Sequence, residues 1–98
     1  HAEIVHISSK GMRSDIHTAS GGKYSCSKSL GVLCKELSHV PSICRVHNSF
    51  AVNLHKISKA KKAKQGLIIM SNGNVIPISK RRKPEFFKKY SEGLPEFK

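Results

Sequence analysis

Apolar residues that alternate with polar ones in short runs, separated by turn residues, are the feature that most limits what this chain can fold into. Such a run occurs from Glu3 to Ile7 near the start, and short strand-like runs rich in apolar residues recur as far along as Val75 to Ile78. Successive side chains of a strand point to opposite faces of a sheet, so a period of two predicts half-buried strands. We therefore expect a mostly β domain built from small antiparallel sheets.

Glycine, asparagine and serine mark the turns between these runs. Ser9 to Gly11 predicts a break after the first strand, and Ala19 to Gly22 predicts a hairpin turn. Asn72-Gly73 predicts a type I′ hairpin turn, in which both central residues need positive φ. The expected strands are Glu3 to Ile7, Arg13 to Thr18, Lys23 to Ser27, Ile43 to Val46, Phe50 to Leu54, Ile57 to Lys64, Leu67 to Met70 and Val75 to Ile78.

One central segment has a helical period instead. Leu30, Leu33, Cys34 and Leu37 fall at i, i+3, i+4 and i+7, which predicts a short amphipathic helix that ends before Pro41. Its N-cap is Ser27 or Ser29, because a serine hydroxyl can accept from a free backbone N–H of the first turn.

A second helical turn or helix is expected at the end, capped by Ser79 and continuing through Lys89, with Pro84 near its start. Its aromatic residues are expected to pack into the core, with base stacking as the alternative; they are Phe86, Phe87 and Tyr90. We expect one domain over residues 3–90 and a tail over residues 91–98.

The charge of the chain points to polyanionic partners. Among 98 residues, 18 are Lys or Arg and 6 are Asp or Glu, which gives a formal net charge of +12. Dense runs lie at Lys56 to Lys64 and at Lys80 to Lys89. A single run is often only a solvated face, but two runs together with the overall excess favour nucleic acid over an acidic membrane.

Cysteine and histidine give no sign of a metal site or a disulfide framework. The three cysteines, Cys26, Cys34 and Cys44, lack CxxC spacing, and none of the six histidines is spaced with them as a zinc ligand. We expect the cysteines to be small core residues in a reducing compartment and expect no metal or other cofactor.

The chain has no apolar stretch near the ~20 residues that span a bilayer and no signal-peptide pattern. We expect a soluble, cytoplasmic domain without membrane contact. The first residue is His1 rather than Met, and we expect a segment of a longer protein, with another domain before it.

Two motifs, Arg45 to Ile57 (RVHNSFAVNLHKI) and Ser71 to Lys83 (SNGNVIPISKRRK), together resemble the LytTR family of bacterial DNA-binding domains. The first is similar to the family pattern R-x-H-x-S-aromatic-x-V-N, and the second is similar to its closing pattern around I-P-I-S. The resemblance covers about residues 3 to 90 and implies several small antiparallel sheets in an elongated arrangement with one short central helix. It implies the output domain of a transcriptional response regulator of a two-component system, without enzymatic activity, preceded by a receiver or sensor domain.

The resemblance also implies how DNA would be bound. Loops between strands would enter successive major grooves, and a homodimer would occupy paired direct repeats. The contact surface would comprise the loop Ser8 to Arg13, the loop His47 to Ser49 and the basic segment that begins at Ser79. Base contacts would come from Arg13, Asn48 and Lys80. Backbone contacts would come from Lys10, Arg45, His47, Ser49, Ser79, Arg81, Arg82 and Lys83.

The side-chain chemistry fits these roles, with alternatives. Asn48 can bond bidentately to adenine and Arg13 to guanine, but Asn48 could instead close an Asx turn. His47 could be a structural hydrogen bonder. Lys80 stands where the family commonly has Arg; it lacks the planar guanidinium fork, and phosphate is its alternative target.

Two other functions compete with this reading. An RNA-binding or ribosome-associated module would need exposed aromatic residues, for which Tyr24 and Phe50 are the candidates. A metal-dependent nuclease would need clustered carboxylates, yet before residue 85 the chain has only Glu3, Asp15 and Glu36, which are scattered.

Overall fold

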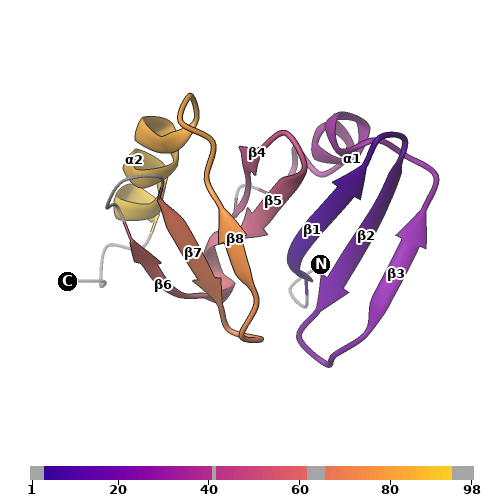
Figure 1. Cartoon of the computed structure of the whole chain (residues 1–98), viewed down its shortest axis with the longest axis horizontal. Helices are drawn as coiled ribbons and strands as arrows, with labels where there is room; N and C mark the ends of the chain where they lie inside the picture. The colour runs from indigo at the N-terminus through magenta and orange to yellow at the C-terminus, as the bar shows by residue number, and fades with distance from the viewer. Residues whose placement is uncertain (1–3, 41, 62–65, 94–98) are drawn as a thin grey trace.

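The computed structural model describes residues 4–40, 42–61 and 66–93 and contains two antiparallel sheets and two α-helices. Figure 1 shows the two sheets side by side, with α1 behind the upper end of one and α2 beside the other. The mostly β prediction is confirmed.

The larger sheet has five strands in the order β3-β2-β1-β5-β4, each antiparallel to its neighbours. Its strands are β1 (Ile4–Lys10), β2 (Arg13–Thr18), β3 (Lys23–Cys26), β4 (Ile43–His47) and β5 (Phe50–Asn53). The break expected at Ser9 to Gly11 is wrong in position: β1 continues to Lys10, because Ser9 pairs with Ser14 and Lys10 pairs with Arg13.

The smaller sheet has the order β6-β7-β8. It follows a short 3₁₀ turn, η1 (Leu54–Lys56), and consists of β6 (Ile57–Lys61), β7 (Leu67–Met70) and β8 (Val75–Pro77). The strand expected to reach Lys64 is described to Lys61, and residues 62–65 lie outside the described part.

The predicted hairpin between β7 and β8 exists, but its turn differs. The Gly73 N–H donates to the Met70 carbonyl at 2.9 Å, which makes Ser71 and Asn72 the central residues of the turn. Gly73 follows with φ +89°. The Met70 N–H donates to the Asn74 carbonyl at 2.9 Å, so Ser71 to Gly73 form a three-residue loop inside this bonded pair, and Gly73 supplies the positive φ at its last position.

The structure has two hydrophobic clusters, and a β-bulge in β1 directs nearby side chains of this strand into both of them. The register shifts between Ile4 and His6, so Val5 and Ile7 pack in different clusters although period two would place them on one face. Val5 packs with Val52 and the small-sheet residue Ile68, whereas Ile7 packs with Ala51 and the helix α1.

The central helix α1 (Leu30–Glu36) matches its prediction closely. The Ser29 hydroxyl accepts from the Val32 N–H, which settles the N-cap. Leu30 and Leu33 are buried against the sheet, as their spacing predicts.

The C-terminal helix α2 (Lys83–Gly93) packs on the hydrophobic cluster that contains Val5 and Ile68. Phe86 and Tyr90 are buried and stack with ring centroids 5.6 Å apart, so the packing role expected for them is confirmed. The helix continues beyond Lys89 into the segment expected to be a tail, and residues 94–98 lie outside the description.

The cysteines of the described region are free. Cys44 is buried in the hydrophobic cluster that also contains Val5 and Ile68, while Cys26 and Cys34 are half-buried. Burial raises the pKa of the Cys34 and Cys44 thiols, which favours their protonated form. The small-core-residue expectation thus holds best for Cys44.

Within the described ranges, neither helix has the length and apolar character that a bilayer crossing requires.

Candidate nucleic-acid interface

Three connections meet at one edge of the molecule, at the top of Figure 1. They are the β1–β2 turn, the β4–β5 turn and the segment between β8 and α2. The Ser9 N–H donates to the Ser49 carbonyl at 2.8 Å, and the Ser79 N–H donates to the Val46 carbonyl at 2.8 Å. The first bond joins the end of β1, next to the first connection, to the second connection, and the second bond joins the third connection to β4, which leads into the second.

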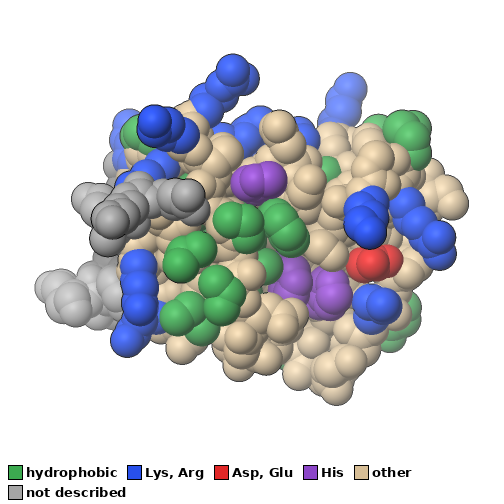
Figure 2. Space-filling view, viewed as in Figure 1, with side chains coloured by type: hydrophobic (Ala, Val, Ile, Leu, Met, Phe, Trp, Pro, Cys, Tyr) green, Lys and Arg blue, Asp and Glu red, His purple; other side chains and the backbone are tan. Residues whose placement is uncertain are grey.

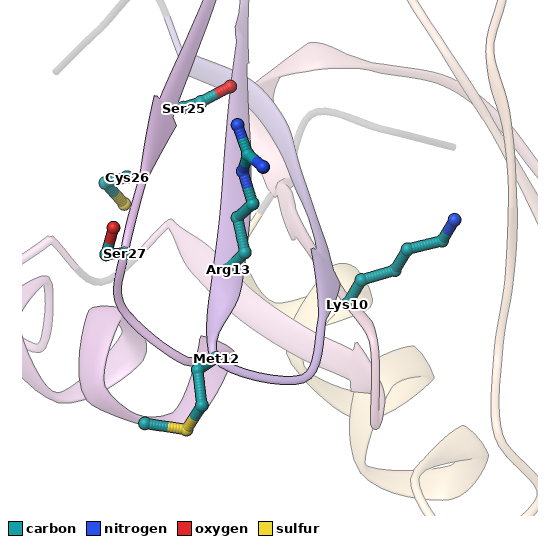
Figure 3. A pocket seen from close by; sticks show the side chains of 6 residues that line it. All are labelled: Lys10, Met12, Arg13, Ser25, Cys26 and Ser27. Atoms are coloured by element: carbon teal, nitrogen blue, oxygen red, sulfur yellow. The ribbon is translucent and has the colours of Figure 1, made fainter.

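The β1–β2 connection is shorter than the loop expected over Ser8 to Arg13. Only Gly11 and Met12 lie outside the strands, and Gly11 has φ +60°, as a two-residue hairpin loop requires. In Figure 3, Met12 lies at the turn, the Arg13 side chain runs toward Ser25, and Lys10 points away from it. Lys10 and Arg13 are both exposed.

Hydrogen bonds from the Arg45 side chain stabilise the β4–β5 connection. The Arg45 guanidinium donates from Nε to the His47 carbonyl at 3.4 Å and from a terminal nitrogen to the Asn48 carbonyl at 3.1 Å. Arg45 was expected to contact the DNA backbone, but its donors already hold this turn. The turn is therefore fixed before any ligand arrives.

His47 is a structural hydrogen bonder, as one of the two expectations had it. Its Nδ1 accepts from the Ser49 N–H at 3.1 Å, and its ring meets the Phe50 ring edge-on at 5.4 Å between centroids. The Asn48 side chain is exposed and has no hydrogen bond to any described residue. The Asx turn is thus not formed, and the Asn48 amide is available to a ligand.

The third connection is a capped basic turn. The Ser79 carbonyl and hydroxyl both accept from the Arg82 N–H, at 3.1 and 3.3 Å, as the predicted cap requires. Lys80 and Arg81 are exposed and Arg82 is half-buried. Lys83 packs close to Gly66, where an added Cβ would meet the Lys83 side chain at 3.3 Å.

The exposed cations of this edge, Lys10, Arg13, Lys80 and Arg81, form no salt bridge with any described residue. In the described part of the chain, the one salt bridge joins Lys28 and Glu36 at 2.8 Å, and neither belongs to the three connections. Blue side chains gather along the upper margin of Figure 2. Lys59 and Lys61 of the basic run lie on β6 in the other sheet, and residues 62–65 lie outside the described part.

A groove that the sequence did not predict opens below the β1–β2 turn. It has a volume of about 430 Å³ and is lined by Ser8, Ser9, Lys10, Arg13, Asp15, Lys23, Ser25 and Phe50. The Ser25 hydroxyl donates to the Asp15 carboxylate at 2.6 Å, and this bond, aided by the nearby Lys23, lowers the carboxyl pKa. The pairing of β2 with β3 brings Lys23 and Ser25 into this groove. Their position there could have been predicted only from the register of these two strands.

Two histidines stack beside this groove. The His6 and His17 rings lie 4.2 Å apart and nearly parallel, and the His17 Nε2 lies 3.1 Å from the Ser8 hydroxyl. Burial, with His17 adding to it, lowers the His6 pKa to about 4, so this ring is neutral at neutral pH. Among the described residues, no three His, Cys, Asp or Glu side chains gather into a metal site.

Comparison with solved structures supports the fold. The chain is similar to the LytTr DNA-binding domain of a Bacillus cereus protein described as a methyl-accepting/DNA response regulator. The TM-score is 0.74 at 22% sequence identity, over 91% of this chain and 81% of the other. A search among curated proteins found no match.

Comparison with family models gives the assignment. The model of the LytTr DNA-binding domain matches residues 1–91, nearly the whole chain. The two motifs that suggested the resemblance include the β4–β5 turn and the capped segment after β8, which lie at the same edge, and the second motif also includes the β7–β8 turn. The chain belongs to the LytTR family of DNA-binding domains.

Proposed function

We propose that this domain binds double-stranded DNA at specific sequences and serves as the output domain of a bacterial transcription regulator. The observation that carries the proposal is the pair of 2.8 Å bonds, Ser9 to Ser49 and Ser79 to Val46, which hold three connections at one basic edge. Short turns presented side by side can reach base edges in the major groove, while the flanking cations contact the phosphates.

In this arrangement, base contacts come from Asn48, Arg13 and Lys80. Asn48 suits adenine, because its exposed amide offers both a donor and an acceptor. Arg13 suits guanine through its planar fork, and Lys80 contacts a base or a phosphate as a point charge.

Backbone contacts come from the side chains around these three. The exposed Lys10 and Arg81 flank the turns, and Arg82, in the third connection, is half-buried. His47 and Arg45 position the β4–β5 turn through the bonds already described. The remaining backbone contacts are Ser49, Ser79 and Lys83.

The same proposal includes a setting for the domain. A homodimer would bind paired direct repeats in the cytoplasm, and an N-terminal receiver or sensor domain would control it. No enzymatic step is assigned to this segment, because its chemistry is that of recognition.

An RNA-binding function is less well supported. The aromatic candidates for base stacking are Tyr24 and Phe50, but the register places them on opposite faces of the large sheet. Tyr24 pairs with Ile16 on the α1 side, whereas Phe50 pairs with Ser8 on the other side. They cannot form one stacking platform of the kind single-stranded RNA requires.

The test begins with selection of a duplex site from a random pool, followed by binding of that site, a scrambled duplex and RNA over a salt series. We expect Asn48→Ala to reduce the preference for the selected site by about 5- to 150-fold, from ~1–3 kcal/mol of base discrimination. We expect Arg82→Ala to weaken both duplexes alike.

Because the Asn48 side chain has no hydrogen bond within the described structure, Asn48→Ala should unfold at the wild-type temperature. Equal affinity of the wild type for all three nucleic acids at every salt concentration would show that sequence-specific DNA binding is wrong.

A further inference from the structure

One face of the large sheet carries polar and basic side chains in rows that lead away from the loop edge. The register pairs Lys10 with Arg13 in the first row. The second row aligns Phe50, Ser8, Asp15 and Ser25.

The third row of this face aligns Val52, His6, His17 and Lys23. The helix α1 covers the opposite face, where it packs on Ile7 and Ala51. At about 3.3 Å per residue, the face extends roughly 13 Å from the Arg13 row to the Lys23 row.

The groove on this face is basic and directly continuous with the proposed recognition edge. Lys10 and Arg13 belong to both, and Lys23 adds a third exposed cation at the far end. Within the described structure, none of the three forms a salt bridge. The single carboxylate of the groove, Asp15, is engaged by the Ser25 hydroxyl at 2.6 Å.

Figure 2 shows the same distribution of charge, with one red side chain among blue ones on the right of the view. A surface with three cations and one occupied carboxylate attracts phosphate. Its open, elongated form suits a phosphate backbone that runs past the edge, because such contacts position a duplex without reading it.

We propose that the groove along β1, β2 and β3 is a second DNA-backbone site, in which Lys23 binds a phosphate of the duplex that flanks the recognition sequence. This inference rests on the proposed function and extends it to residues outside both family motifs. Asp15 limits the affinity of the site, because its negative charge lies among the cations that face the phosphate.

The experiment compares a duplex that ends at the selected site with one that extends ~10 base pairs beyond it on both sides. One phosphate contact contributes about 0.9 to the slope of log K against log salt, or about fivefold in affinity at ~0.15 M salt. We expect Lys23→Gln to lose about fivefold, with the matching loss of slope, on the long duplex alone.

Asp15→Asn retains an acceptor for Ser25, and we expect it to bind the long duplex several-fold more tightly. Lys35→Gln is the control, because Lys35 is an exposed cation on α1, away from the groove. It should match the wild type on both duplexes.

Three results would overturn the inference. They are wild-type binding of the long duplex by Lys23→Gln, equal losses on both duplexes, or a control that loses as much as Lys23→Gln. If the wild type binds neither duplex, the proposed function itself has failed.

A further arm separates DNA from a free anion. We follow the backbone amide chemical shifts of Lys23 and Ser25 during titration. We expect the long duplex to change them until they reach a plateau, whereas inorganic phosphate alone should produce no plateau. Saturation by inorganic phosphate, with no response to the duplex, would assign the groove to a small anion and contradict the DNA-backbone site.

Discussion

Arg45→Lys tests whether Arg45 acts through the β4–β5 turn or directly on DNA. The substitution keeps the positive charge but removes the planar fork that reaches the His47 and Asn48 carbonyls together. Hydrogen bonds from a charged donor are worth about 1.5–3 kcal/mol. Because the guanidinium is partly exposed and one of its bonds is long at 3.4 Å, we expect a loss of about 1 kcal/mol.

Without these bonds the turn must be ordered when DNA binds, and this ordering costs the same ~1 kcal/mol. The affinity for a selected duplex should therefore weaken about fivefold. Binding of scrambled duplex and the salt slope should stay at wild-type values, because the charge is unchanged. Fluorescence anisotropy with both duplexes over a salt series measures all three quantities. Wild-type affinity of Arg45→Lys for the selected duplex would refute the bracing role, because any cation would then suffice.

Three further predictions concern stability. Since the His6 pKa is about 4 when folded and 6.5 when unfolded, the unfolded chain binds the extra proton between these values. Stability should therefore be constant above pH 6.5 and fall by up to about 3 kcal/mol as the pH drops to 4. Urea denaturation between pH 4 and 6.5 measures this fall in the free energy of unfolding, and the fall should be much smaller in His6→Asn. An equal fall in His6→Asn would show that other groups cause it. Phe86→Ala should cost about 3–5 kcal/mol in urea denaturation, because the side chain is fully buried, and a cost below ~1 kcal/mol would contradict that packing. Gly11→Ala should cost about 1–2 kcal/mol from the backbone alone, since nothing lies within 4 Å of an added Cβ, and an unchanged melting temperature would argue against the positive φ.

Much of the architecture could be predicted from local sequence patterns. Period-two alternation located the strands, and the spacing of Leu30 and Leu33 located α1, because burial of one face imposes these periods. Strand ends and turn geometry were less predictable. Asn72-Gly73 indicated a hairpin, but the turn is centred one residue earlier, since the pairing of β7 with β8 sets how many residues connect them.

The site depended more on contacts between distant parts of the chain. Ser9 and Ser49 are 40 residues apart in sequence, and no local pattern predicts the bond between them. The brace formed by Arg45 and the place of Lys23 in the groove likewise depend on tertiary structure and strand register. The resemblance to a family identified the contact segments, whereas their joining at one edge emerged from the fold.

Backbone amide chemical-shift mapping with the selected duplex tests directly whether the three connections contact DNA together. We predict that the largest changes fall together on residues 10–13, 47–49 and 79–83, since these segments form one edge in the structure. Largest changes on β6 (Ile57–Lys61), with those three segments unaffected, would show that DNA binds at another surface.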